Sequence, residues 1–393
     1  MARKKDQAPQ LTPTQQLKAL ESRFAFVKPA RVILTSIKAV PTRFVQLDHA
    51  TRVWGWPIQR AAVIHGPSNE GKTALGLGLL ASFVEAGGMA DLVDAERTTT
   101  ADWARQLVGD TADSPRFIAR RPSSYEKCVD ETRELHRAVR DARAAGELPA
   151  HASMLTLIDS LRKLVPEDIL AKIKKEGASG AKGSVDGMGG RAAQIRAAMN
   201  AAWLDELVPL VDECMTAWIA IARESEDPEA DMWDRKFGND YKVQGGKAVV
   251  YDAALRCRVE RDSWVTIPKP GESDKKQVVG ERHKVTILKT KVGGKEDRAT
   301  VAYFHTSNGV AYPFGFDRAR DVLEIAERFG IVEVGDGVVW KKEKWRGREA
   351  FLTAIRGADG ELETLEAEVR SRFEDKAPVE ADEVASPTIE VRS

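Results

Sequence analysis

The residues with the clearest chemistry in this 393-residue chain form one glycine-rich segment, Gly66-Pro67-Ser68-Asn69-Glu70-Gly71-Lys72-Thr73. It matches the pattern G-x-x-x-x-G-K-[ST], in which glycines let backbone N–H groups approach a phosphate and the following helix contributes its positive end. Lys72 would reach the β- and γ-phosphates, and the Thr73 hydroxyl would hold Mg²⁺. Together with Ala74, the segment predicts a binding site for ATP or GTP with Mg²⁺.

Two carboxylates follow predicted strands and could complete this site. Asp159 directly follows the apolar stretch 155–158, where it could organise the ligands of Mg²⁺ beside the phosphate loop. It could instead be the N-cap of a helix that begins near Leu161. Glu96 follows the strand 90–93, and a carboxylate at that position can orient or deprotonate an attacking water.

These side chains need a frame of alternating strands and helices. The apolar run 61–65 leads into the glycine-rich segment, and a helix over 72–86 follows it. Further strands are predicted at 90–93 and 154–158, with a charged amphipathic helix over 125–145 between them. Such alternation is typical of an α/β protein with a mainly parallel sheet covered by helices on both faces.

Two long segments interrupt the alternation. Residues 172–191 contain six glycines, and five Lys or Arg against two acids. Residues 224–246 are polar and end in Gly245-Gly246. Loops of this length inside a compact core are usually either functional or disordered.

The two ends of the chain have compositions of their own. Thr12 as N-cap, a proline and then a glutamine predict a short helix, which packs either on the core or on a neighbouring subunit. A helix over 318–329 and a hairpin over 331–340 predict a small α/β domain. Eleven acids against four basic residues from 359 to 393 predict a solvated end. The expected parts are an N-terminal arm and helix (1–33), a core (34–312), a small C-terminal domain (313–373) and an acidic disordered tail (374–393).

Composition narrows the class of protein and its surroundings. The formal net charge is zero, so local basic patches rather than a whole-protein field would have to attract nucleic acid. Cys128, Cys214 and Cys257 lie far apart, which favours a reducing compartment and argues against a disulfide framework or a zinc site. Because no apolar run is long enough to span a membrane and the N-terminus lacks a signal-peptide core, we expect a cytoplasmic protein without membrane contact.

These elements, in this order, resemble the RecA family of DNA recombinases over roughly 34–373. Asp94-Ala95-Glu96 matches the Asp-Ala-Glu of that family, which implies that Glu96 is the catalytic glutamate. Trp103 falls where the family places an aromatic that stacks on adenine, although it could also be a buried tryptophan. The resemblance implies a P-loop ATPase core with a parallel sheet, using ATP and Mg²⁺.

A lysine pair and both long loops extend the resemblance. Lys289 and Lys291 resemble a pair of family lysines that reaches the ATP of the adjacent subunit. The resemblance implies that they stabilise charge on the transferred phosphoryl group. Alternatively, the two lysines could simply be an exposed strand end. Met188-Gly189 lies in the segment of the first DNA-binding loop, and Phe237-Gly238-Asn239, followed after five residues by Gly245-Gly246, reproduces the second. Met188 and Phe237 would separate stretched base triplets. The basic residues expected to hold DNA phosphates are Lys182, Arg191, Arg196, Arg235 and Lys242.

Three departures from the family pattern concern the sites themselves. Arg223 stands where the family has a glutamine that senses the γ-phosphate, and an arginine could still contact that phosphate as a fixed charge. Thr100 replaces an acid near the adenine, which implies weaker base selectivity. Acids are unfavourable beside DNA phosphates, so the first, acidic half of the second loop is expected to point away from DNA. Those acids are Glu224, Glu226, Asp227, Glu229 and Asp231. The mixture fits a divergent member of the family, for example a phage-encoded one.

The function implied is an ATP-dependent homologous recombinase that forms a helical filament on single-stranded DNA and exchanges strands with duplex DNA. A hexameric helicase with the same fold, and an accessory protein that binds DNA and nucleotide without strand exchange, are the alternatives. The basic run Lys341–Arg348 could capture incoming duplex or be a solvated hairpin edge.

Overall fold

The computed structural model of the chain describes residues 12–23, 37–178, 189–233, 241–269, 272–293, 298–307 and 314–374. The chain divides into two compact units, Met1–Ile37 and Lys38–Ser393. The first unit contains the helix α1 (Pro13–Arg23). The backbone N–H of Thr12 donates to Gln15 Oε1 at 2.9 Å, and the backbone N–H of Gln15 donates to Thr12 Oγ1 at 3.4 Å. These reciprocal bonds confirm the predicted helix start.

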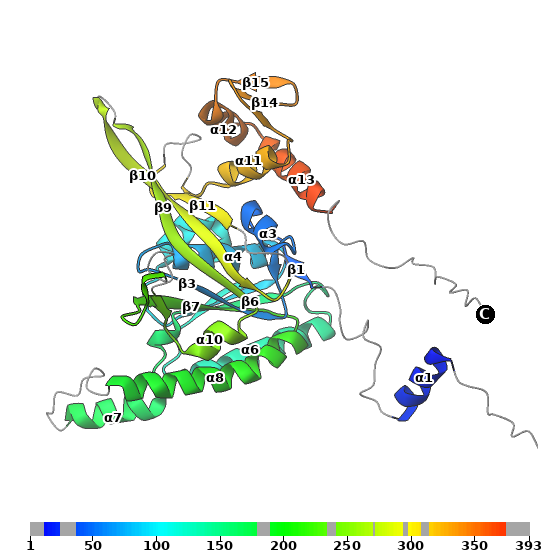
Figure 1. The fold of residues 1–393 in the computed structure, drawn as a ribbon, viewed down its shortest axis with the longest axis vertical. Helices are drawn as coiled ribbons and strands as arrows, with labels where there is room; N and C mark the ends of the chain where they lie inside the picture. Colours follow the sequence, from blue (N-terminus) through cyan, green and yellow to red (C-terminus); the bar gives the residue numbers. More distant parts are fainter. Residues whose placement is uncertain are drawn as a thin grey trace, which may run out of the picture. The chain divides into compact units, whose positions relative to one another are not determined.

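A ten-stranded sheet forms the centre of the second unit (Figure 1). Its strands lie in the order β12 (Gly315–Phe316), β11 (Arg298–Phe304), β10 (Glu272–Thr290), β9 (Leu255–Lys269), β3 (Arg60–Gly66), β7 (Ala217–Glu226), β6 (Met154–Asp159), β4 (Met89–Asp94) and β5 (Phe117–Arg120), and β8 (Tyr241–Val243) pairs with β7. Along this order, the neighbouring strands from β9 through β3, β7, β6 and β4 to β5 pair in parallel. The pairs β9–β10, β10–β11, β11–β12 and β7–β8 are antiparallel. The predicted α/β class with a mainly parallel sheet is therefore confirmed.

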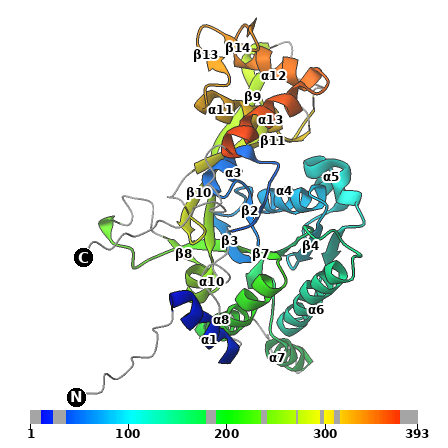
Figure 2. The same cartoon turned by 90° about the vertical axis from the view of Figure 1, so that its right-hand side faces the viewer.

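Helices cover both faces of this sheet. One face carries α3 (Val45–Thr51), α4 (Lys72–Glu85) and α5 (Ala101–Val108), and the other carries α6 (Tyr125–Ala144), α8 (Gly189–Glu213) and α10 (Lys247–Asp252) (Figure 2). The alternation of side chains along β3 explains the two layers. Ala62 and Ile64 join the core under α4, whereas Ala61 and Val63 join the core under α6 and α8.

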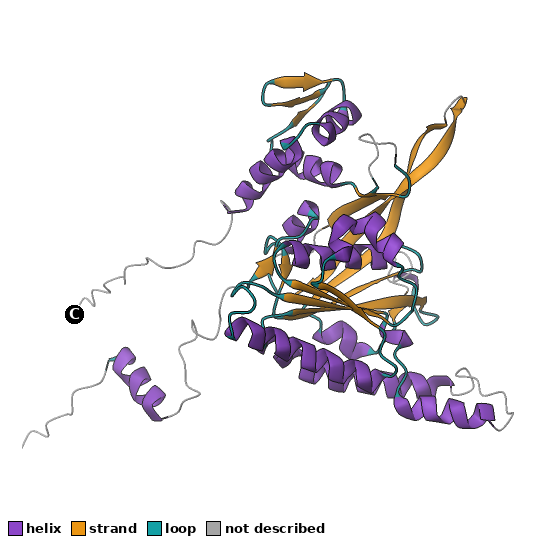
Figure 3. Cartoon of the chain, turned by 180° about the vertical axis from the view of Figure 1, so that it is seen from behind, coloured by secondary structure: helices purple, strands orange, loops and turns teal. Residues whose placement is uncertain are grey.

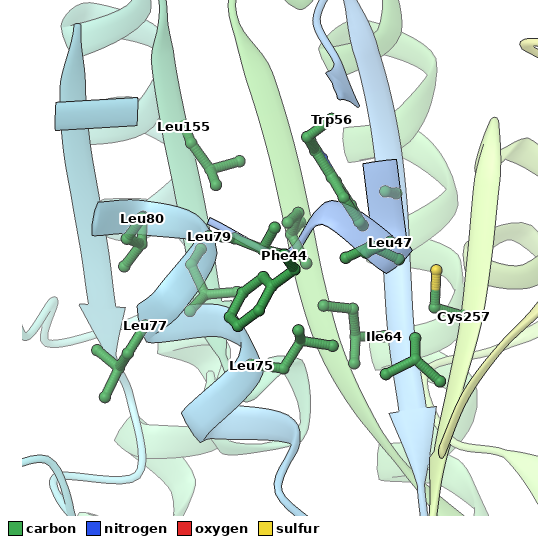
Figure 4. Packing of buried hydrophobic residues seen from close by; sticks show 14 of the residues in the cluster. Phe44, Leu47, Trp56, Ile64, Leu75, Leu77, Leu79, Leu80, Leu155 and Cys257 are labelled. Atoms are coloured by element: carbon green, nitrogen blue, oxygen red, sulfur yellow. The ribbon is translucent and has the colours of Figure 1, made fainter. Parts of the chain in front are cut away.

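The packing of α4 fixes the direction of its first turn. Phe44, Leu47 and Trp56 pack beside the leucines of α4 and against the sheet residue Ile64 (Figure 4). Gly78 lets the Phe44 ring approach α4, because a Cβ at this position would lie 2.3 Å from Phe44 Cζ. The glycine-rich segment between β3 and α4 is thus held from both ends by buried apolar surface.

Regular structure enters both segments that were expected to be long loops. The helix α7 (Glu167–Ala178) occupies part of 172–191, and α8 begins at Gly189. Buried Ile169 anchors α7, and acids in its first turn with Lys175 in its last turn favour a helix. In 224–246, β7 continues to Glu226 and pairs with β8, with Glu226 opposite Tyr241. The expected loops are therefore shorter than the composition indicated.

The remaining elements lie beside β11 and α3. A three-stranded antiparallel sheet of β13 (Glu333–Val334), β14 (Val338–Trp340) and β15 (Glu343–Trp345) packs with α11 (Arg318–Arg328), α12 (Arg348–Gly357) and α13 (Glu361–Glu374). The predicted hairpin turn at 335–337 is confirmed, since Val334 pairs with Val338. Their common core includes Val45 of α3, and Arg370 bonds to Asp48, so these elements are tied to the main sheet. The short pieces are β1 (Ala39–Val40), β2 (Trp56–Pro57) and the single turns Gly109–Asp113 and Leu161–Lys163.

Two further features complete the outline. The strands β9 and β10 continue as an antiparallel hairpin that projects beyond the helical layers (Figure 3). Among the described helices, none combines the length and the apolar character that crossing a lipid bilayer would require.

Candidate functional site

The glycine-rich segment turns tightly between β3 and α4. Gly66 has a φ of +154° and Gly71 a φ of +78°, which favour glycine. A Cβ on Gly66 would lie 2.0 Å from the carbonyl oxygen of Val259, and one on Gly71 would lie 2.8 Å from the ring of His283. Both positions therefore need glycine for close approach as well as for conformation.

Lys72 is the first residue of α4, and its side chain is buried. The ammonium donates to the carbonyl oxygen of Pro67. Burial lowers the pKa of Lys72 below its ordinary value, while the Glu224 and Asp159 carboxylates act in the opposite direction. A poorly solvated cation at the start of a helix is well suited to holding a phosphate.

Thr73 and Asp159 converge on one point from different elements. Thr73 Oγ1 donates to Asp159 Oδ2 at 2.6 Å, linking α4 to the last residue of β6. Burial raises the pKa of Asp159 to about 6, with the hydrogen bond from Thr73 opposing the rise. Ser160 rather than Asp159 precedes the helical turn at Leu161, so the N-cap alternative for Asp159 is wrong. A hydroxyl and a carboxylate form the oxygen donor set that suits Mg²⁺.

Glu96 lies just beyond β4 and is held by two side chains. Ser160 Oγ donates to Glu96 Oε1 at 2.6 Å, and Arg223 Nη2 lies 2.9 Å from each carboxylate oxygen. Burial alone would raise the pKa of Glu96, but the hydrogen bond from Ser160 and the charge of Arg223 outweigh it and bring the pKa below its ordinary value. The arginine that replaces the expected glutamine thus contacts the expected general base.

One cavity of about 340 Å³ brings these residues together. Its lining comprises Ser68, Asn69, Glu70, Gly71, Lys72, Thr73, Ala74, Glu96, Trp103, Asp159, Ile221, Arg223, Arg261, Glu281 and Tyr303. Of the residues predicted for the nucleotide, Gly66 and Pro67 are not in this lining. Half-buried Trp103 is in it, and Thr100 caps α5 by accepting from the backbone N–H of Trp103 at 3.2 Å.

Five residues at this site were missed by sequence reasoning: Ser160, Ile221, Arg261, Glu281 and Tyr303. Three of them lie on neighbouring antiparallel strands, where Glu281 of β10 pairs with Tyr303 of β11 and Arg261 Nε bonds to Glu281 at 3.0 Å. No local pattern marks such residues, because strand pairing brings them to the cavity. For Ser160, its place directly after Asp159 was the available signal.

The two lysines expected to act in trans lie away from this cavity. Lys289 pairs with Arg256 of β9, and Arg256 pairs in turn with Val63 of β3. Lys289 therefore lies two strands away from β3, at the level of Val63, which precedes the phosphate loop. Its ammonium donates to the carbonyl oxygens of Val250, at 3.2 Å, and Tyr251 at the end of α10. Burial, followed by repulsion from Lys291 and Arg256, lowers the pKa of Lys289. Lys291 is exposed.

A second cavity, of about 500 Å³, lies between α8, which follows the first segment expected to bind DNA, and residues 242–246 of the second segment. Of the predicted residues, Arg196 of α8, Lys242 of β8 and the pair Gly245-Gly246 line it. Arg162, which the sequence did not single out, lines it as well, and burial together with the charge of Arg162 lowers the pKa of Arg196. Two guanidinium groups that line one cavity form a site suited to an anion.

The glycine pair sets the approach of the second segment to α8. Gly245 and Gly246 have φ values of +114° and +96°, and a Cβ on Gly246 would lie 2.8 Å from the Cβ of Ala197. Asn200 Nδ2 donates to the carbonyl oxygen of Gly245 at 2.8 Å, and Asn200 Oδ1 accepts from the Tyr125 hydroxyl at 2.9 Å. These contacts hold the turn after β8 against the helix.

The acids at the start of the second segment are engaged within the protein. Glu224 accepts from Arg258 at 3.0 Å and lies 2.8 Å from His65 Nδ1. Asp227 and Glu229 contact the Lys242 ammonium at 2.8 and 3.2 Å, which offsets part of its charge. The predicted residues Lys182, Met188, Arg235, Phe237, Gly238 and Asn239 lie outside the described residues, as do 375–393 of the tail. Arg191 and Gly189 lie in α8, although only the backbone of Arg191 is described.

Comparison with known proteins gives this arrangement its family. The family model described as RecA N-terminal domain matches residues 16–310, which is most of the chain. The chain belongs to the RecA family.

Its relatives within the RecA family are distant but cover most of its length. Protein RecA of Chloroherpeton thalassium is 25% identical over 364 residues, which span 91% of this chain and 88% of the relative. Protein RecA of Chlorobaculum parvum is 26% identical over 336 residues, and that of Geobacter sulfurreducens is 27% identical over 302 residues. Those alignments cover 85% and 76% of this chain, and 83% and 75% of the relatives. Low identity over nearly complete length identifies a divergent RecA-family protein.

Proposed function

We propose that this chain is an ATP-dependent DNA recombinase, which assembles on single-stranded DNA as a helical filament and exchanges its strand with a homologous duplex. The observation that carries the proposal is the position of β7 between the two cavities. Arg223 of β7 lines the first cavity and Ser225 the second, and the backbone N–H of Gln244 donates to the carbonyl oxygen of Arg223 at 2.9 Å. A change at one cavity therefore has a direct covalent and hydrogen-bonded route to the other.

The first cavity would bind ATP and promote attack of water on its terminal phosphate. Lys72 and the backbone of 68–73 hold the phosphates, and Trp103 stacks on the base. Glu96 takes a proton from the attacking water, and Ser160 fixes the orientation of its carboxylate. Thr73 and Asp159 would hold Mg²⁺, which would offset the negative charge of the phosphates when bound.

The lysine pair would complete the site of an adjacent subunit. Lys289 and Lys291 lie away from the cavity of their own chain, so a second copy has to bring them to the phosphates. An interface formed by two different faces of each subunit generates an open helical assembly. Cations supplied in this way stabilise charge on the transferred phosphoryl group, which ties hydrolysis to filament formation.

The second cavity would hold the DNA backbone. Arg196 and Arg162 offer guanidinium groups, while the glycine pair allows a phosphate to approach the backbone N–H groups. Lys242 would contribute less, because Asp227 and Glu229 already contact it. Residues of the same two segments outside the described part would complete the contact, with Met188 and Phe237 between base triplets and Lys182, Arg191 and Arg235 on phosphates.

Electron microscopy of the full chain with single-stranded DNA and a slowly hydrolysed ATP analogue tests the assembly, and a strand-exchange assay tests the reaction. Filaments with strand exchange are expected. Closed rings that translocate along DNA would favour the helicase alternative instead. Filaments that bind DNA but exchange no strands would favour the accessory protein, for which the contact between Arg223 and Glu96 is the supporting observation.

A further inference from the structure

The contact between Arg223 and Glu96 joins two groups that would both act on the terminal phosphate of ATP. One nitrogen of the guanidinium, Nη2, lies 2.9 Å from both carboxylate oxygens. Within the described part of the chain, the Arg223 side chain makes no other hydrogen bond, and Arg223 lines the cavity, so its other two nitrogens are not engaged by another side chain or carbonyl there. The arginine side chain is 34% exposed and the glutamate side chain 15% exposed.

This pairing is easier to break than a parallel, two-nitrogen contact. A single nitrogen shared between two oxygens lacks the fork geometry that makes arginine–carboxylate pairs strong, and partial exposure to water weakens it further. The terminal phosphate of ATP offers three oxygens and more negative charge than one carboxylate. A phosphate in the cavity beside Lys72 and Thr73 would therefore compete well for the guanidinium.

Glu96 would keep its place if the arginine left. Ser160 Oγ donates to its carboxylate at 2.6 Å, and the backbone N–H of Glu96 donates to the carbonyl oxygen of Asp159 at 3.0 Å. These two bonds anchor the glutamate to the end of β6 independently of Arg223. Removal of the guanidinium would thus free one carboxylate oxygen for a water without loosening the residue.

We propose that Arg223 exchanges the Glu96 carboxylate for the terminal phosphate when ATP binds, so that one residue both recognises the third phosphate and releases the general base. ADP lacks that phosphate and leaves the pair intact. Arg223 is in this sense a positioning residue for Glu96 and a determinant of the choice between ATP and ADP. The inference rests on the proposed nucleotide site but not on filament formation or strand exchange.

A double-mutant cycle measured by nucleotide binding, without DNA, tests the exchange. The variants of the full chain are Glu96→Gln, Arg223→Gln and both together, titrated with Mg²⁺ complexes of ATPγS and of ADP. With Arg223 present, Glu96→Gln removes both the competitor for the guanidinium and the repulsion between Glu96 and phosphate. In the Arg223→Gln background it removes only the repulsion. We expect Glu96→Gln to tighten ATPγS binding by about tenfold with Arg223 and clearly less without it.

Two controls and the sign of the coupling make the outcome decisive. ADP affinity should be the same in all variants, which would also show that the nucleotide site is intact. Arg105→Gln on α5, which removes an exposed arginine outside the cavity, is the control for the loss of one positive charge. Arg223→Lys should restore part of the coupling, because it keeps the charge but not the planar nitrogen edge. Equal tightening in both backgrounds, or greater tightening without Arg223, would overturn the exchange, even with filaments and strand exchange intact. A wild-type chain that binds neither nucleotide would overturn the proposed function and the exchange together.

Discussion

The Thr73 hydroxyl donates a 2.6 Å hydrogen bond to the Asp159 carboxylate, which joins the first turn of α4 to the last residue of β6. The two oxygens come from segments 86 residues apart in sequence. Their meeting depends on the parallel order β3–β7–β6, which brings the end of β6 beside the phosphate loop. A local motif and a distant strand end therefore meet at the site that we propose for a divalent cation and phosphate.

Asp159→Asn should remove most of the benefit that Mg²⁺ gives to ATP binding. The amide keeps the size of the side chain and can still bond to Thr73, but it loses the charge that organises the cation. We expect ATPγS affinity in MgCl₂ to fall by about 10- to 100-fold, with little change in EDTA. Asp110→Asn, which removes an exposed carboxylate before β5, is the control. An equal loss in MgCl₂ and in EDTA would point to misfolding or to a direct phosphate contact.

Replacing Lys289 and Lys291 should separate nucleotide binding from hydrolysis. The double alanine variant leaves the cavity of the same chain unchanged, so ATPγS binding without DNA should stay close to wild type. DNA-stimulated ATPase activity should fall by about 1,000-fold or more, as expected when a cation supplied by a neighbour is lost.

Lys289 also bonds to the last carbonyl oxygens of α10, so Lys291→Ala is the cleaner single change. Its side chain is exposed, and truncation removes charge without removing those bonds. A parallel loss of nucleotide binding and hydrolysis in this variant would count against a role in trans.

Much of the first site follows from local patterns. The phosphate loop and Asp159 could be predicted because a short apolar stretch directly before each one places it at the carboxyl edge of a parallel sheet, and Glu96 because it comes two residues after β4. The capping box at Thr12 and the hairpin at 335–337 were predictable for the same reason, since each is encoded within a few residues.

What could not be predicted depends on which strands become neighbours. Glu281 and Tyr303 reach the cavity through antiparallel pairing beyond β9, and Arg261 through the register of β9 with β10. Arg223 and Glu96 are 127 residues apart in sequence. Their contact likewise requires that β7 and β4 end at the same edge of the sheet. Alternating hydrophobicity shows which face of a strand is buried but not its partner.

Arg196→Ala should weaken binding to single-stranded DNA more than Lys242→Ala. Both residues line the second cavity, but Asp227 and Glu229 contact Lys242 and reduce the charge it can offer. Each lost phosphate contact should lower the slope of log affinity against log salt concentration by about 0.7.

Fluorescence anisotropy with an oligonucleotide over a series of NaCl concentrations measures both quantities. Lys127→Ala removes an exposed lysine on α6 and is the matched control for net charge. If Arg196→Ala leaves the salt slope unchanged while Lys127→Ala lowers it, the second cavity does not hold the DNA backbone.

His136 should make the protein less stable as pH falls. The ring is fully buried on α6, with Nδ1 2.6 Å from Thr216 Oγ1 and Nε2 3.1 Å from Thr156 Oγ1. Thr156 donates its hydroxyl proton to Asp91 at 2.9 Å, so it accepts from Nε2–H, and Nδ1 accepts from Thr216. Both bonds can form with a neutral ring that carries its proton on Nε2. Burial, aided by the charge of Arg120, lowers the pKa of His136 from 6.5 to about 3.

The sign of the effect follows from proton binding. Between pH 6.5 and about 3 the unfolded chain binds a proton at His136 that the folded chain does not. The free energy of unfolding therefore decreases by about 1.4 kcal/mol for each unit by which the pH is lowered. His136→Gln can make both hydrogen bonds without titrating, so its free energy of unfolding should fall less steeply by that amount. Urea unfolding at several pH values between about 6 and 4.5 measures the difference. His151→Gln, which removes an exposed histidine, is the control. Identical slopes for His136→Gln and wild type would mean that His136 is protonated in the folded protein.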